Sequence, residues 1–175
     1  GGSPLYAAGD LMIADFDTGE KPNNLGGDFG AWDKDPDDDT QSCNFSFDQD
    51  DALGNKTGYS VRLDYDVDST NAAYNGFWMK LNGLDATGYN TLSFYIRGDA
   101  KAGYSKRVKI ELKDQKATSG YMLSGITDGW QKVSIPFDKF RRIGDWAALN
   151  EFVVVFDDVN SRPKSGTIYI DQIEL

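Results

Sequence analysis

Apolar and polar residues alternate along most of this chain. At 61–65, 92–96, 108–112 and 133–137, apolar side chains occupy every second position. Because successive side chains of a β-strand point to opposite faces, this period predicts strands with one buried face. Residues 152–156 are apolar at every position, which indicates a strand that is central or lines a groove. The pattern predicts about ten strands, with the others near 11–16, 44–48, 74–81 and 121–126 and from 167.

The other features of the chain also favour an all-β fold. The best helical candidate is the short piece 138–142, and no internal repeat is visible. Glycines supply turn signals at the spacing that is typical of sandwiches and jelly rolls. We therefore predict one antiparallel β-sandwich (jelly roll) at 11–175, preceded by a linker or tag remnant at 1–10. Residues 17–57, rich in Gly, Asn and Asp, are expected to be irregular and either functional or held by a ligand.

The charge and the apolar runs exclude several classes of partner. The formal net charge is −10, so nucleic acid and anionic membrane surfaces would both repel the protein. No apolar run reaches 18 residues, and no transmembrane helix is predicted. The single cysteine, Cys43, permits no intrachain disulfide and leaves the cellular compartment open.

Most catalytic sites need residues that this chain lacks. It has no histidine and only one cysteine, which excludes Ser-His-Asp triads, Cys-His pairs and the usual zinc sites. Glycoside hydrolysis by two carboxylates needs neither residue type. The nearest approach to a paired-acid motif is Glu111–Lys116, whose spacing differs from the Glu-x-Asp-x-x-Glu of β-jelly-roll glucanases and which lacks a second glutamate. We therefore predict that the domain is not an enzyme.

Two groups of acidic residues are candidates for cation binding. The first crowds one loop, but an EF-hand beginning at Asp33 would need Gly and Glu where Asp38 and Asn44 stand. That loop is either a solvated acidic segment or the site of a second, loop-ordering Ca²⁺. In the other group, Asp15 and Asp17 are two residues apart on one predicted strand and share a face. They and Asp171 of the last strand either face solvent or supply oxygen ligands to a hard cation.

Several motifs together resemble a known family. They are Ile13-Ala14-Asp15-Phe16-Asp17, then Trp130-Gln131-Lys132-Val133-Ser134-Ile135-Pro136-Phe137 followed by Phe140-Arg141-Arg142, and the closing strand from Ser165-Gly166 to Ile173. The chain resembles the β-sandwich carbohydrate-binding modules with a galactose-binding-domain-like fold, most closely family 11, over nearly all of residues 11–175. The resemblance implies structural Ca²⁺ held by Asp15, Asp17 and Asp171.

The resemblance also implies a ligand groove on one sheet. In that family aromatic rings and polar groups of a concave sheet bind β-glucan chains. The corresponding positions here are Trp32, Tyr65, Arg142, Asp145, Trp146 and Phe156. Among the other aromatic residues, we assign to the core Phe16, Phe94, Phe137, Phe140 and Phe152, whereas Trp78 and Trp130 are undecided.

The functional expectation is a non-catalytic module that binds a polysaccharide, a β-glucan-type chain by preference. It would be monomeric, secreted from a bacterium, and part of a larger multidomain glycoside hydrolase that it keeps near its substrate. The alternatives are a protein–protein interaction or assembly domain of the same sandwich fold and, less favoured, a glycoside hydrolase. Linkage specificity depends on groove curvature and loops, so the motifs do not choose the glycan.

Overall fold

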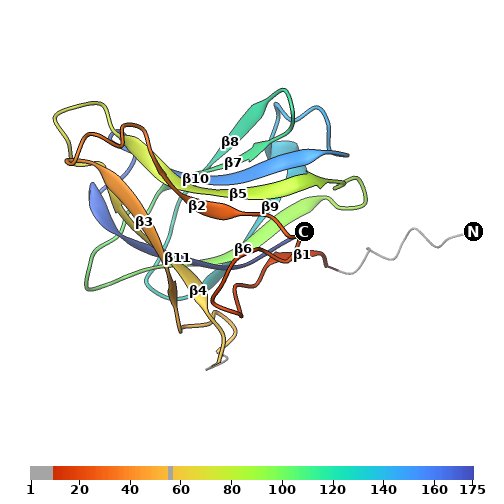
Figure 1. Ribbon diagram of the computed structural model, residues 1–175, viewed down its shortest axis with the longest axis horizontal. Helices are drawn as coiled ribbons and strands as arrows, with labels where there is room; N and C mark the ends of the chain where they lie inside the picture. Colours follow the sequence, from red (N-terminus) through yellow and green to blue (C-terminus); the bar gives the residue numbers. More distant parts are fainter. Residues whose placement is uncertain (1–9, 55–56) are drawn as a thin grey trace, which may run out of the picture.

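The computed structural model describes residues 10–54 and 57–175, and they form two antiparallel β-sheets packed face to face (Figure 1). The predicted linker at 1–10 lies outside the described residues, except for Asp10. The sheet that we call the β11 sheet has the order β3-β4-β11-β6-β9, and β1 also pairs with β11. The other, which we call the β10 sheet, has the order β2-β5-β10-β7-β8. The jelly-roll sandwich predicted from the alternation is thus confirmed.

The described chain contains eleven strands. Those of the β11 sheet are β1 (Met12–Ala14), β3 (Ser42–Asp48), β4 (Ser60–Asp66), β6 (Thr91–Gly98), β9 (Gln131–Pro136) and β11 (Ser165–Glu174). Those of the β10 sheet are β2 (Phe29–Asp33), β5 (Tyr74–Leu84), β7 (Val108–Lys113), β8 (Thr118–Leu123) and β10 (Leu149–Asp157). The short piece expected to be helical is a single 3₁₀ turn, η2 (Phe137–Lys139).

The strand that the sequence pattern missed is β2. It lies inside the segment expected to be irregular. It is an edge strand of the β10 sheet and pairs with β5. Gly30 interrupts its alternation, and a strand of five residues offers few positions to count. The register of β2 is therefore defined by its pairing with β5 and not by its own sequence pattern.

The core lies between the two sheets. The five phenylalanines assigned to it from the sequence are all buried, with exposed fractions of 9% or less. In β10, Phe152, Val154 and Phe156 face this core, whereas Val153 and Val155 belong to the opposite, outer face. The prediction that this strand is central is confirmed, since β10 lies between β5 and β7.

Candidate functional site

Two tryptophan–glycine pairs lie next to each other on the outer face of the β10 sheet. In the antiparallel register of β2 and β5, Gly30 is opposite Trp78 and Trp32 is opposite Gly76. A Cβ atom at Gly30 would stand 3.1 Å from Cζ2 of Trp78; one at Gly76 would overlap the Val154 carbonyl oxygen and would stand 3.3 Å from Nε1 of Trp32. Each indole therefore lies close to a residue without a side chain on the neighbouring strand, and both tryptophans are partly exposed.

Packing, not hydrogen bonding, holds these rings. Nε1 of Trp32 is buried and has no hydrogen-bond partner among the described residues. The ring of Tyr74 lies 5.8 Å from that of Trp32, measured between centroids, and Tyr74 is 44% exposed. The ammonium groups of Lys34 and Lys80 flank this surface, 5.9 Å from the Tyr74 ring and 5.6 Å from the Trp78 ring. We call Trp32, Tyr74 and Trp78 the aromatic platform.

The same face continues across the sheet as an aliphatic and then a charged strip. Trp78 is opposite Val153, which is opposite Glu111, and Gly76 is opposite Val155 in the next row. Lys109 and Glu111 form an ion pair of 3.4 Å on β7. The face thus offers apolar surface for the rings of a ligand and charged groups for its hydroxyl rim.

Two hollows adjoin this strip. One of about 620 Å³ lies against β7 and β8, against η2, which contributes Lys139, and against the segment after η2, which contributes Arg141 and Arg142. The other, of about 300 Å³, lies where β5 ends and β10 begins. There Glu151 contacts Lys80 at 3.7 Å and Lys113 at 3.6 Å. Both hollows are of a size and polarity that suit a small hydroxylated ligand.

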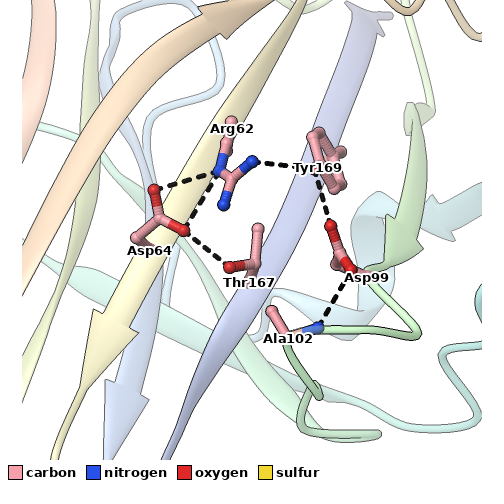
Figure 2. Close-up of polar contacts among 6 residues, drawn as sticks. All are labelled: Arg62, Asp64, Asp99, Ala102, Thr167 and Tyr169. Carbon is pink, nitrogen blue, oxygen red and sulfur yellow. Dashed lines mark hydrogen bonds and ion pairs between the residues drawn. The ribbon is translucent and has the colours of Figure 1, made fainter.

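The outer face of the β11 sheet is occupied by its own side chains (Figure 2). Arg62 donates from Nε to both Asp64 oxygens at 3.1 Å and from Nη1 to the Tyr169 hydroxyl at 3.3 Å. That hydroxyl donates to Asp99 at 2.9 Å, and Thr167 donates to Asp64 at 2.6 Å. The Ala102 amide and the Tyr169 hydroxyl hold the pKa of Asp99 below its usual range.

Guanidinium groups cover the aromatic ring at the centre of this network. The Arg97 guanidinium lies 3.8 Å from the Tyr169 centroid and that of Arg62 lies 5.8 Å from it. Tyr169 is consequently 3% exposed although it points away from the core. Cation–π contacts occur on both sheets, but Tyr74 on the β10 sheet is 44% exposed, whereas Tyr169 on the β11 sheet is buried beneath the guanidinium groups. The more exposed aromatic surface is therefore that of the β10 sheet.

Two of the predicted groove residues are wrong, because they belong to the core. The rings of Tyr65 and Phe156 stack on each other between the sheets, with centroids 4.2 Å apart and planes at 6°. The Tyr65 hydroxyl donates to the Pro163 carbonyl at 2.9 Å and accepts the Ser105 amide at 2.7 Å. Burial raises the pKa of this phenol to about 12. In a strand that is apolar on both faces, as 152–156 is, the sequence does not reveal which residues face inward.

The three predicted site residues after η2 are not brought together. Arg142 lines the hollow on β7 and β8, whereas the Trp146 ring stacks on Phe137 with centroids 4.1 Å apart. Asp145 is exposed, and its carboxylate accepts the Ala147 amide at 3.1 Å. The turn that separates them is anchored by a residue that sequence reasoning did not assign.

That anchor is Asp114 at the end of β7. Its carboxylate accepts backbone N–H groups from Lys116 and Ala117 on one side and from Gly144 and Asp145 on the other, at 2.7–3.0 Å. These bonds, led by the Gly144 amide, lower the pKa of Asp114 to about 2. An ionised carboxylate thus holds the turn that sends Arg142 and Trp146 in different directions.

Of the predicted ligand residues, Trp32 is the one that the structure places on the platform. Its binding role stays a prediction. Tyr74 and Trp78 were not assigned, yet the alternation in 74–81 carried the signal. It puts Phe77 and Met79 on one face of β5 and the two platform residues on the other. The register with β2, which the sequence did not reveal, was needed to show that Trp78 lies beside Trp32.

Of the three acidic residues predicted to bind Ca²⁺, Asp17 and Asp171 lie close together and Asp15 does not take part. Oδ2 of Asp15 is turned away and accepts the Asn24 amide at 3.2 Å. Asp17 and Asp171 instead approach Asp51, which the sequence analysis did not name. Burial, with the charges of Asp51 and Asp17, raises the pKa of Asp171 to about 7, and burial with the charges of Asp15 and Asp51 raises that of Asp17.

The backbone next to these acids is unusual. Phe16 and Gln172, which are not glycines, have φ values of 57° and 51° and directly adjoin Asp17 and Asp171. Such left-handed residues are costly and concentrate where a side chain must be aimed. Within residues 10–54 and 57–175, no group of three or more His, Cys, Asp or Glu side chains is arranged so that it could hold a metal ion.

The acidic loop between β2 and β3 is ordered by its own hydrogen bonds. Asp38 accepts Thr40 at 2.6 Å, Gln41 at 2.8 Å and Asn71 at 3.0 Å, and these bonds hold its pKa below its usual range. Asp33 accepts the Cys43 amide at 2.7 Å. These contacts explain the order of the loop, and the second Ca²⁺ considered for it stays an untested prediction.

Comparisons with known proteins agree with this geometry. The sequence matches the family model of Carbohydrate binding domain 30 over residues 23–175. No curated protein matches. The fold is similar to that of the family 11 carbohydrate-binding module of the cellulosomal cellulase Lic26A-Cel5E of Clostridium thermocellum. That similarity has a TM-score of 0.67 at 20% identity and covers 95% of this chain and 94% of that chain.

Two further solved structures share the fold. A family 11 module from Clostridium thermocellum, in complex with a beta-1,3-1,4-mixed-linked tetrasaccharide, has a TM-score of 0.67 at 19% identity and covers 95% of this chain and 94% of that chain. An exo-beta-agarase is similar with a TM-score of 0.65 at 13% identity. The similarity covers 94% of this chain but only 24% of the agarase chain. The sandwich therefore occurs both as an isolated module and within a larger carbohydrate-active chain.

The described residues contain no helix that is long and apolar enough to cross a membrane. The predicted kind of protein, a β-sandwich carbohydrate-binding module, is confirmed, with family 30 as the matching sequence family and family 11 as a source of similar folds. An aromatic platform on one sheet and a family match over most of the chain lead to one conclusion: this chain belongs to the family of carbohydrate-binding domain 30 and is a carbohydrate-binding module.

Proposed function

We propose that the module binds a β-glucan chain along the outer face of the β10 sheet. A pyranose ring has an apolar face of C–H groups and a rim of hydroxyls. The outward faces of Trp32 and Trp78 would cover the C–H faces of successive sugar rings, and Tyr74 would extend this contact. The ion-paired side chains of Lys109, Glu111 and Glu151, together with Arg142, would exchange hydrogen bonds with the hydroxyls.

The observation that carries this proposal is the pairing of each indole with a glycine on the neighbouring strand. A Cβ atom at Gly30 or at Gly76 would stand within 3.3 Å of the opposite indole, so these glycines leave room for two partly exposed rings side by side on one face. A preformed surface loses little conformational entropy on binding. Support for the ligand class comes from the related fold whose structure contains a mixed-linked β-glucan tetrasaccharide.

The expected affinity is modest, because an open face leaves one side of the ligand in water. Binding free energies of about −4 to −8 kcal/mol correspond to dissociation constants from millimolar to micromolar. The test is affinity electrophoresis and calorimetry against mixed-linkage β-glucan, xyloglucan, cellulose, mannan and starch. Binding to a β-glucan with weak or no binding to starch is the expected result, and failure to bind any of the five glycans contradicts the proposal.

The module is further proposed to be a secreted, monomeric part of a bacterial glycoside hydrolase and to have no hydrolytic activity of its own. The larger exo-beta-agarase chain that contains a similar sandwich supports this context. Glu111 and Glu151 lie on adjacent strands of the ligand face, and they are the carboxylates to test. No release of reducing sugar from bound glucan is expected. Release that disappears in Glu111→Gln or Glu151→Gln would show that the module is an enzyme.

A structural Ca²⁺ is proposed at the acids next to β1 and β11. The candidate ligands are Asp17, Asp51 and Asp171, with backbone carbonyls or water completing the six to eight oxygens that Ca²⁺ requires. The supporting observation is the fully buried carboxylate of Asp171, whose pKa is raised by burial and by two neighbouring negative charges. When bound, the cation would neutralise this group and connect the first and last strands.

A further inference from the structure

A third hollow, which has an aromatic wall, lies at the end of the sandwich, where β5 leads into β6. Its volume is about 600 Å³, and its lining includes Tyr89, Asn90, Phe137, Asp138 and Trp146. Tyr74 of the aromatic platform begins β5, and the hollow begins just after its last residue, Leu84. Leu84 lies six residues beyond Trp78, the platform residue nearest to it on β5, or roughly 20 Å away at about 3.3 Å per residue. The hollow is therefore distinct from the platform.

Backbone hydrogen bonds fix the walls of this hollow. The Ala86 amide donates to the Trp146 carbonyl at 2.7 Å, and the Phe137 amide donates to the Asn90 carbonyl at 2.8 Å. The loop after β5, the end of β9 and the turn that carries Trp146 are thereby tied to one another. A site made of three connected segments needs little ordering when a ligand enters.

The wall combines ring surface with unused polar groups. Phe137 covers one face of the Trp146 indole, with centroids 4.1 Å apart and planes at 10°, which leaves the opposite face and the ring edges for a ligand. Among the described contacts, neither the Asn90 amide nitrogen nor the Asp138 carboxylate has a hydrogen-bond partner, and both residues are exposed. An amide donor and a carboxylate acceptor beside an aromatic face suit an uncharged polyol, whereas Asp138 would repel an anion.

We propose that this hollow is a second saccharide-binding site, which takes a short neutral oligosaccharide or the end of a glucan chain. The volume falls within the usual range for small-molecule pockets, roughly 300–1,000 Å³. The proposal rests on the proposed function only in its choice of glycans, since the residues of the two sites do not overlap. A module with two sites about 20 Å apart could hold two chains, or two segments of one chain, and so gain avidity on insoluble substrate.

The test uses the four indole N–H resonances of the protein in proton–nitrogen NMR spectra, assigned by single Trp→Phe variants. Cellohexaose and the mixed-linkage tetrasaccharide are titrated into the wild type and into Trp32→Ala/Trp78→Ala. We expect the Trp146 resonance to shift in both proteins, with the same midpoint. Trp130, on the outer face of the β11 sheet, serves as the control resonance and should not move.

A second variant avoids any effect on packing. Asn90→Ala/Asp138→Ala keeps the Trp146–Phe137 stack and should weaken the Trp146 response at least fivefold while the Trp32 and Trp78 responses stay unchanged. If Trp146 does not respond to either glycan, or responds only when the platform is intact, the second site is refuted and the platform is unaffected. If Trp146 responds while Trp32 and Trp78 do not, the platform proposal is refuted and the second site stands.

Discussion

Removal of the Trp78 ring is the sharpest test of the aromatic platform. Trp78 is partly buried, with one indole face over Gly30. A sugar ring on the open face would remove roughly 60 Å² of protein surface and a similar area of its own from water. At about 25 cal/mol per Å², those roughly 120 Å² are worth about 3 kcal/mol before the costs of ordering. We therefore expect Trp78→Ala to weaken glucan binding by about 10- to 150-fold, or ~1.5–3 kcal/mol.

The assay is isothermal titration calorimetry with cellohexaose and soluble β-glucan, with thermal unfolding of each variant to show that it is folded. Trp130→Ala is the matched control, because it removes a partly buried indole from the outer face of the other sheet, where Arg97 covers it. Gly30→Ala is the complementary change. Its Cβ would stand 3.1 Å from the Trp78 ring and lift it, so a smaller loss than that of Trp78→Ala is expected.

The reasoning fails if folded Trp78→Ala binds with wild-type affinity, or if Trp130→Ala weakens binding as much as Trp78→Ala does. Either result would show that the open face of the β10 sheet is not where the glycan lies.

Three further outcomes follow from buried groups. In EDTA, the contribution of Asp171 to stability should be fully present below about pH 4 and fall as pH rises through about 7, because folded Asp171 keeps its proton to higher pH than the unfolded chain does. Added Ca²⁺ should abolish that fall and Asp171→Asn should remove it, as melts across pH would show; a melting temperature unchanged by Ca²⁺ at pH 7 refutes the cation site. Tyr65→Phe should lower the free energy of unfolding by ~2–3 kcal/mol without changing glycan affinity, since it strands the Ser105 amide and the Pro163 carbonyl; a loss of affinity without a loss of stability would return Tyr65 to the binding site. Asp114→Ala should lower the melting temperature and speed amide hydrogen exchange at residues 144 and 145, and unchanged exchange there would refute its anchoring role.

Local patterns were enough to predict the sandwich. Alternation of period two needs only neighbouring residues, and it identified nearly all the strands and the five core phenylalanines. It also put Trp78 and Phe77 on opposite faces of one strand. The alternation does not show which face of a strand turns inward when both faces are apolar. For this reason Phe156 was predicted to line the groove, and Val153 and Val155 were not considered.

The composition and motifs of the sequence determined the class of molecule: an acidic all-β domain without the residues of most catalytic sites, similar to carbohydrate-binding modules. Only the tertiary structure decided where a ligand can lie. The platform depends on the register of β2 against β5, which sets Gly30 under Trp78 and Gly76 under Trp32. Register results from pairing between segments more than forty residues apart, and its energy lies in cross-strand contacts that no local pattern records.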